Sequence, residues 1–97
     1  MHQQEMAESL RELAEVLSGI TDAHLMEAFL MDLLTERETG ELAGRWELLK
    51  RLHAGQTQRS IADALGMSLC KITRGSRELK KPHSAVLRVV EGWRQRT

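Results

Sequence analysis

The sequence has few aromatic residues, one cysteine and one proline. Aromatic side chains make up 3% of the 97 residues, namely Phe29, Trp46 and Trp93. Such a chain builds a modest core, so its apolar helix faces are expected to pack against a partner chain. The lone Cys70 excludes an internal disulfide and favours a reduced, cytoplasmic protein.

Long apolar runs are also missing. No stretch approaches the ~20 apolar residues of a membrane span, and the first residues, "MHQQEMAESL", lack the basic start and apolar block of a signal peptide. No membrane partner is therefore expected.

The formal net charge is zero, but the charges are unevenly spread. Residues 1–55 hold 5 basic and 11 acidic residues, whereas residues 56–97 hold 9 basic and 3 acidic residues. A basic half favours a polyanionic partner such as nucleic acid, although ordinary solvated charge explains the same asymmetry.

Apolar residues recur at helical spacing and strand patterns are absent, which predicts an all-α fold. Thr21 is expected to cap the second helix, and Thr35 with Glu38 forms a capping box for the third. The apolar stretch "LMEAFLMDLL" suggests deep burial of the second helix, including burial between chains. Six helices are expected, at about residues 3–18, 22–32, 36–54, 58–65, 69–79 and 84–95.

The third helix is expected to bury one apolar face. That face consists of Leu42, Trp46, Leu49 and Leu52. Trp46 is interpreted as a core residue and not as a platform for a ligand, because it shares helical spacing with these leucines.

The stretch "TQRSIADALGMSLCKITRGSRELK" has helix-turn-helix spacing. Counting from Gln58, a small residue comes fifth (Ala62), a glycine ninth (Gly66) and a β-branched residue fifteenth (Ile72). Ala62 lets two helices cross closely, Gly66 can take a positive φ in the turn, and Ile72 buries the inner face. Helical hairpins also serve as plain packing units, so the basic charge around this pair is what favours DNA.

The same stretch, preceded by "LLTERETGELAGRWELLKRLHAG", resembles the tryptophan repressor family over roughly residues 24–90. "ITRGS" followed by "LK" is the most specific part. The resemblance implies a six-helix intertwined homodimer of single-domain chains. Residues 1–55 would form the dimerisation core, 56–80 the helix-turn-helix reading head, and 83–97 a C-terminal helix of the core.

The resemblance also implies a function. The homodimer would bind operator double-stranded DNA when L-tryptophan is bound as corepressor, and would control tryptophan biosynthesis or transport genes. No other cofactor is implied.

Six ligand-binding residues are implied by the resemblance. Arg45 and Arg74 would enclose the two faces of the indole, with Arg74 also meeting the carboxylate, a contact that guanidinium planes favour. Leu34 and Thr35 would offer carbonyls to the amino group. Gly75 would let the ring approach the helix backbone, and Glu78 stands where a small hydroxyl residue usually holds the amino group.

Each of these assignments has an alternative. An i,i+4 pair with Glu41 explains Arg45, and a simple weak point in the helix explains Gly75. Asp32 and Glu78 depart from the family pattern, which leaves open a DNA-binding regulator of the same fold with a different ligand or none. If Gly75 does border a ligand, Gly75→Trp is expected to abolish ligand binding and leave the dimer folded.

The resemblance also implies a set of DNA-binding residues on the two short helices. Arginine among them can bind guanine bidentately, and lysines can neutralise phosphates. The set comprises Gln58, Arg59, Ser68, Leu69, Cys70, Lys71, Thr73 and Lys80.

Catalysis and metal binding are not expected. The sequence has no nucleophile beside a base, no phosphate-binding loop and no His or Cys spacing typical of a metal site. A pure protein-interaction module would leave the basic reading head unexplained.

Overall fold

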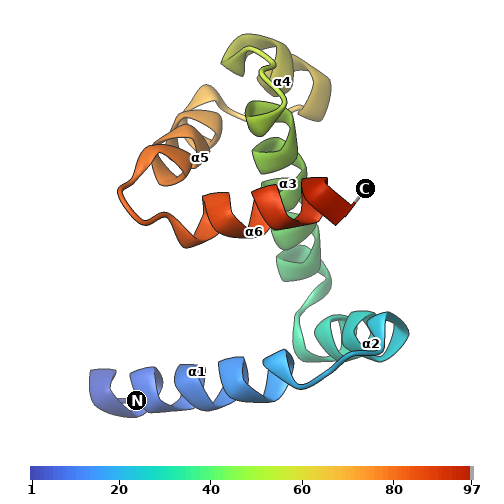
Figure 1. Cartoon of the computed structure of the whole chain (residues 1–97), viewed down its shortest axis with the longest axis vertical. Helices are drawn as coiled ribbons and strands as arrows, with labels where there is room; N and C mark the ends of the chain where they lie inside the picture. Colours follow the sequence, from blue (N-terminus) through green and yellow to red (C-terminus); the bar gives the residue numbers. More distant parts are fainter. Residues whose placement is uncertain (97) are drawn as a thin grey trace. The chain divides into compact units, whose positions relative to one another are not determined.

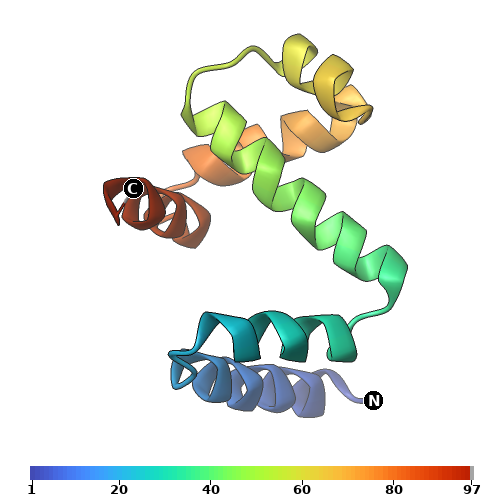
Figure 2. The same cartoon turned by 90° about the vertical axis from the view of Figure 1, so that its right-hand side faces the viewer.

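The computed structural model describes residues 1–96. Its six helices agree with the expected ranges to within one residue at each end, which confirms the all-helical fold (Figures 1 and 2). They are α1 (Gln3–Ser18), α2 (Ala23–Leu33), α3 (Glu36–His53), α4 (Gln58–Leu65), α5 (Leu69–Lys80) and α6 (Ala85–Arg96). Thr97, the last residue of the expected C-terminal segment, lies outside the described residues.

Side-chain caps set where several helices begin. The capping box of α3 is confirmed, since the Thr35 amide donates to Glu38 at 2.9 Å and the Glu38 amide donates to the Thr35 hydroxyl at 3.1 Å. The expected cap of α2 was wrong by one position. Asp22, and not Thr21, is the N-cap, because its carboxylate accepts from the His24 amide at 2.9 Å.

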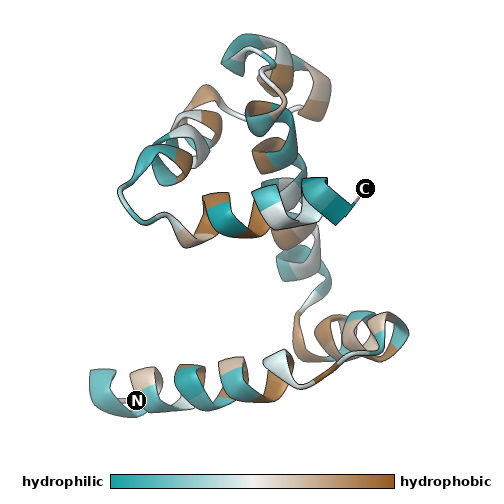
Figure 3. Ribbon diagram, viewed as in Figure 1, coloured by the Kyte–Doolittle hydropathy of each residue, from teal (hydrophilic) through white to brown (hydrophobic). Residues whose placement is uncertain are grey.

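The chain divides into two compact units, Met1–Thr39 and Gly40–Thr97. The first unit contains α1 and α2, and neither helix has a buried residue. The deep burial expected of α2 is therefore not found within one chain, where Leu25 is 56% and Met31 61% exposed. Figure 3 shows hydrophobic residues along both helices.

The second unit has its core where α4 and α5 meet α3. Ile61 and Ile72 are fully buried there, beside Leu48 and Ala62. Leu48, which lies outside the expected face, is the buried residue of α3, and Leu42 of that face is 46% exposed in the single chain. The physical reason is that α4 and α5 pack on the side of α3 that carries Leu48. Leu49 and Leu52 pack around this core, as expected.

Helix α6 contacts α5, and its side chains also contact the C-terminal part of α3. Trp93 of α6 meets Trp46 of α3 edge to face, with ring centroids 5.8 Å apart. The Arg94 guanidinium donates to the Lys50 carbonyl at 3.0 Å and to His53 Nδ1 at 2.9 Å. Trp46 is thus half-buried against a second indole and not a fully buried core residue.

Over residues 1–96, the structure has no helix with the length and apolar character needed to cross a membrane.

Candidate functional site

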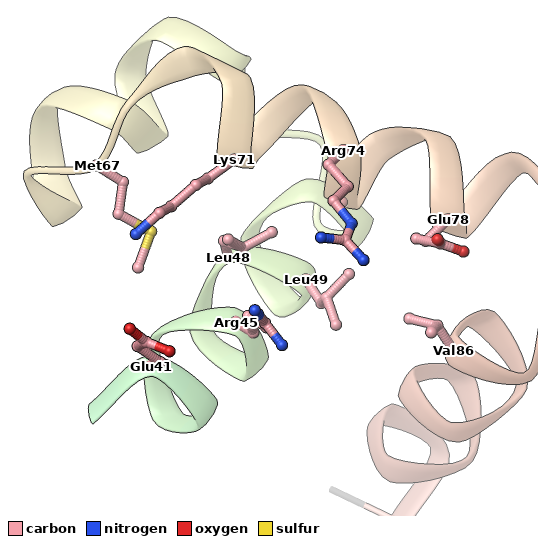
Figure 4. A pocket seen from close by; sticks show the side chains of 10 residues that line it. Glu41, Arg45, Leu48, Leu49, Met67, Lys71, Arg74, Glu78 and Val86 are labelled. Carbon is pink, nitrogen blue, oxygen red and sulfur yellow. The ribbon is translucent and has the colours of Figure 1, made fainter. Parts of the chain in front are cut away.

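A pocket of about 410 Å³ lies between α3, α5 and α6 (Figure 4). Its floor is apolar and its rim is charged, a combination that suits a small amphipathic ligand. The lining residues are Glu41, Arg45, Leu48, Leu49, Met67, Lys71, Arg74, Gly75, Glu78 and Val86.

Four of the expected ligand residues line this pocket together: Arg45, Arg74, Gly75 and Glu78. Arg45 comes from α3 and Arg74 from α5, and Figure 4 shows both guanidinium groups reaching toward the space between these helices. Two planar cations on opposite walls can enclose a flat aromatic ring and bind an anionic group at its edge.

The remaining two expected ligand residues, Leu34 and Thr35, belong to the first unit. Leu34 is the C-cap of α2, and its amide donates to the Leu30 carbonyl. Thr35 caps α3 through the capping box with Glu38. The Leu34 carbonyl lies at the C-terminus of α2, where the helix dipole favours a cation. The Thr35 carbonyl lies at the start of α3, where it accepts from the Thr39 amide at 2.9 Å and from the Thr39 hydroxyl at 3.0 Å.

Gly75 has a packing role that the sequence did not reveal. It is buried in the middle of α5, and a Cβ at this position would collide with Cδ1 of Leu48 on α3. The glycine therefore allows α5 to approach α3 closely, with or without a ligand. A Gly75→Trp variant would consequently disturb this packing as well as the pocket, so the expectation that it leaves the fold unaffected is corrected.

Glu78 already has a partner within the chain. The Lys81 ammonium lies 3.0 Å from one carboxylate oxygen of Glu78 and 2.8 Å from the other. This hydrogen-bonded cation lowers the pKa of the Glu78 carboxyl, with a smaller contribution from Arg74. Glu78 is therefore ionised at neutral pH, and the Lys81 cation offsets most of the negative charge of its carboxylate.

The wall formed by α6 is held in place by one hydroxyl group. Ser84 is buried, and its Oγ donates to the Glu78 carbonyl at 2.7 Å while accepting from the Leu87 amide at 3.0 Å. This hydroxyl joins the end of α5 to the start of α6, and so fixes Val86 at the edge of the pocket.

Sequence reasoning missed several lining residues. Lys71 had been assigned to the DNA-binding set, yet Figure 4 shows it extending past Met67 on the side of the pocket where Glu41 lies. Positions 71, 74, 75 and 78 share one face of a helix because residues three and four apart are neighbours. That spacing was the available signal for Lys71.

Helices α4 and α5 form a packed pair joined by a tight turn. The expected caps are confirmed: Thr57 accepts from the Ser60 amide and Ser68 from the Lys71 amide. Gly66 ends α4 with φ of 64°, a left-handed conformation that favours glycine. Ile61 of α4 and Ile72 of α5 close the interface between the helices.

The expected DNA-binding residues occupy the outer surface of this pair. Arg59, Leu69, Cys70 and Lys80 are exposed. Ser68 is also exposed, although its hydroxyl is engaged as the α5 cap.

Gln58 and Thr73 belong to the same expected set and are joined to each other. The Thr73 hydroxyl donates to Gln58 Oε1 at 2.8 Å. This contact leaves the amide nitrogen of Gln58 as a hydrogen-bond donor.

Fold and site together define a small all-helical protein with a ligand-sized pocket beside a pair of short, capped helices. Comparison with known families narrows this class. The family model described as "Trp repressor protein" matches residues 8–91, and the chain belongs to this family, which is regulatory and not enzymatic.

Curated relatives agree with this assignment. The chain is 34% identical over 76 residues to the "Trp operon repressor homolog" of Vibrio parahaemolyticus, an alignment that covers 77% of this chain and 74% of the relative. It is 35% identical over 71 residues to the Vibrio campbellii protein of the same name, which covers 72% of this chain and 71% of the relative. No solved structure matches the chain significantly.

A third relative matches a shorter stretch at higher identity. The "Trp operon repressor homolog" of Chlamydia trachomatis serovar D is 42% identical over 59 residues, covering 56% of this chain and 63% of the relative.

Proposed function

We propose that this protein is a cytoplasmic, ligand-dependent transcriptional repressor that binds operator DNA as a homodimer when L-tryptophan occupies the pocket. It would control genes of tryptophan biosynthesis or transport. The observation that carries the proposal is that one helix, α5, belongs to both the pocket and the outer surface. It lines the pocket with Arg74 and Gly75, and it presents Leu69 and Cys70 on its exposed side. A ligand that shifts α5 would change the outer surface at the same time.

The α4–α5 pair is proposed as the DNA-reading element, a helix-turn-helix. In such elements the second helix enters the major groove while the first contacts the backbone. Leu69 and Cys70 would make apolar contacts to thymine methyl groups, and Gln58 would donate to base acceptors. Arg59 and Lys80 are exposed and would bind phosphates or guanine.

The pocket is proposed to bind L-tryptophan with its ring between Arg45 and Arg74. The apolar side chains of Leu48 and Leu49 at the floor would contact the indole, and Arg74 would meet the carboxylate. The carbonyls of Leu34 and Thr35 would accept from the amino group.

Homodimerisation is proposed to cover the apolar residues that α1 and α2 leave exposed. Met6, Leu10, Leu25, Met31 and Leu33 are each more than half exposed in the single chain. Large apolar side chains left exposed in this number mark an interaction site, and two copies would bury them mutually. Sedimentation equilibrium at micromolar concentration should give twice the mass of one chain, whereas a monomer would contradict the dimer.

The function is tested by titrating the protein calorimetrically with L-tryptophan, followed by gel shifts on DNA selected in vitro. One saturable site per chain is expected, with DNA affinity raised by a coupling free energy of about 1–3 kcal/mol. DNA binding that is equal with and without the ligand would contradict ligand dependence.

A single substitution tests the role of the DNA-reading surface independently of ligand binding in the pocket. Arg59→Ala should weaken DNA binding, because one phosphate or guanine contact is lost, and should leave the affinity for the ligand unchanged. Arg59 is exposed and lies outside the residues that line the pocket. Unchanged DNA binding by Arg59→Ala would remove this residue from the reading surface.

A second candidate function is a DNA-binding regulator of the same fold that responds to another ligand or to none. The ion pair between Glu78 and Lys81 favours it, since this carboxylate is already neutralised at the position where an amino group would be held. This candidate predicts DNA binding that L-tryptophan does not change.

A further inference from the structure

A second pocket, of about 310 Å³, opens where the carboxyl end of α3 meets α6. It shares no lining residue with the pocket between α3, α5 and α6. Among the residues that the structure describes, its walls carry three cationic side chains and one carboxylate, and such an excess of positive charge attracts an anionic partner. The walls include Glu47, Lys50, Arg51, Gln56, Trp93 and Arg94.

Lys50 is held in place by groups on two helices. Its ammonium lies 2.6 Å from a carboxylate oxygen of Glu47 on α3 and 5.4 Å from the centre of the Trp93 ring on α6. The Lys50 side chain is nevertheless 25% exposed, so its cation can be reached from solvent. Because the side chain is already ordered, contact with an anion costs little further conformational entropy.

Arg94 reaches the same end of α3 from α6. Its guanidinium donates to the Lys50 carbonyl at 3.0 Å and to His53 Nδ1 at 2.9 Å. The guanidinium carbon also lies 5.3 Å from the centre of the Trp93 ring. These contacts place the Arg94 cation beside that of Lys50, on the wall of one pocket.

Arg51 connects this pocket to the loop that precedes α4. Its Nε lies 3.1 Å from a carboxylate oxygen of Glu47, and its carbonyl accepts from the Gln56 amide at 3.1 Å. Gln56 comes two residues before Gln58, the first residue of α4, and two residues span at most about 7 Å. The pocket therefore borders the start of α4, where Gln58 and Arg59 are proposed to contact DNA.

Double-stranded DNA continues past any single contact. Successive phosphates of one strand follow one another at a rise of about 3.4 Å, so a strand that touches the start of α4 carries further phosphates along the neighbouring surface. Fixed cations on that surface would neutralise phosphates and release counterions. The partner that fits the second pocket is therefore the sugar-phosphate backbone of DNA.

We infer that Lys50, Arg51 and Arg94 form a second DNA-contact surface, outside the helix-turn-helix, that binds backbone phosphates flanking the site which α4 and α5 read. The inference rests on the proposed function, in which the α4–α5 pair reads DNA, and it adds a phosphate-binding surface built by α3 and α6. Phosphate contacts carry no sequence information directly, so this surface raises affinity without changing base preference.

The test is the salt dependence of DNA binding by the full chain with L-tryptophan present. Fluorescence anisotropy would be measured on a labelled duplex, selected in vitro, that extends beyond the selected site on both sides. Each phosphate contact contributes about 0.9 to the slope of log affinity against log salt. The slope would be determined between about 50 and 200 mM salt, a range over which a few contacts change the affinity measurably.

Two variants remove one cation each from this surface. Lys50→Met keeps an unbranched apolar side chain against Trp93, and Arg51→Gln keeps a hydrogen-bond donor near Glu47. Each should lower the magnitude of the slope by about 0.9 per lost contact and weaken binding by about fourfold per contact at 200 mM salt. Arg51→Lys keeps the charge and should retain the slope.

A third variant should strengthen DNA binding. Hydrogen bonds from Lys50 and then Arg51 lower the pKa of the Glu47 carboxyl, so this group is ionised at neutral pH and competes with phosphates for both cations. Glu47→Gln should therefore raise DNA affinity by about three- to fivefold at low salt. A role of Glu47 in folding alone predicts no such gain.

The matched control is Arg88→Gln, which removes an exposed cation from α6 outside the walls of both pockets. It should leave the slope and the affinity unchanged. Thermal denaturation of each variant checks that the fold is retained. Binding to duplexes with single base-pair changes should show the same order of preference in Lys50→Met as in the unchanged protein.

The outcomes separate the inference from the proposed function. Equal slopes for the unchanged protein, Lys50→Met and Arg51→Gln would overturn the inference alone, because DNA binding by the α4–α5 pair would remain. A slope lowered as much in Arg88→Gln as in Lys50→Met would also overturn it, since any surface cation would then have the same effect. Absence of DNA binding by the unchanged protein would overturn both the inference and the proposed function.

Discussion

Replacing Gly75 by alanine tests the close contact between α5 and α3. In an open helix interior, glycine to alanine stabilises the fold by about 0.5–1 kcal/mol. Here the new Cβ would collide with Cδ1 of Leu48, a core residue that is 2% exposed, and would also come within 3.4 Å of Leu52. Overpacking of this kind costs about 1–3 kcal/mol. The net expectation is a destabilisation of about 1 kcal/mol.

The matched control is Gly92→Ala in α6, where an added Cβ would have no neighbour within 4 Å. This variant should show the ordinary gain of about 0.5–1 kcal/mol. Both free energies of unfolding would be measured by urea denaturation at one protein concentration, because association shifts apparent stability.

A double-mutant cycle with Leu48→Ala isolates the contact. In that background the methyl of alanine at position 75 has room, so Gly75→Ala should no longer destabilise. If Gly75→Ala stabilises the otherwise unchanged protein as much as Gly92→Ala does, the proposed steric role of the glycine is refuted.

Two further predictions concern hydrogen bonds at helix ends. Hydrogen bonds from Thr35 lower the pKa of Glu38 below its ordinary value of 4.5, so its contribution to stability is present above that pH and is lost as the pH falls through the lowered pKa. Urea denaturation across pH 3–6 should therefore show a weaker pH dependence in Glu38→Gln, and identical profiles would contradict the capping box. Ser84→Ala should cost about 1–2 kcal/mol because a buried residue loses two hydrogen bonds. The control is Ser18→Ala, because the Ser18 hydroxyl donates to one exposed carbonyl. This variant should change the unfolding free energy by less than about 0.5 kcal/mol. Equal losses in the two serine variants would contradict the role of Ser84.

Local chemistry made the helices predictable. Capping residues and apolar spacing located all six to within one residue, because both act over a single helical turn. The start of α2 shows the limit of this reasoning. Thr21 and Asp22 are adjacent and both can cap a helix, and only backbone geometry decides that Asp22 accepts from His24.

The buried face of α3 could not be predicted in the same way. Leu48 and Leu49 are neighbours on the helix, and the choice between them depends on where α4 and α5 pack. Burial at such a position is a tertiary property, so the spacing of apolar residues along one helix leaves it open. The exposed leucines and methionines of α1 and α2 illustrate the same point, since a single chain does not bury them.

The candidate site was predicted in part. The family resemblance identified Arg45, Arg74, Gly75 and Glu78, which the fold brings to one pocket. It did not identify the ion pair of Glu78 with Lys81, for which the i,i+3 spacing of the two residues was an available signal.

The hydrogen bond between Thr73 and Gln58 links two positions that lie 15 residues apart in the sequence. Neither side chain can be altered without changing what the other presents. A library that randomises these positions one at a time would therefore sample each residue in a context set by its unchanged partner. Altered preference should emerge from paired substitutions, which makes positions 58 and 73 a single two-residue unit for engineering and for sequence comparison.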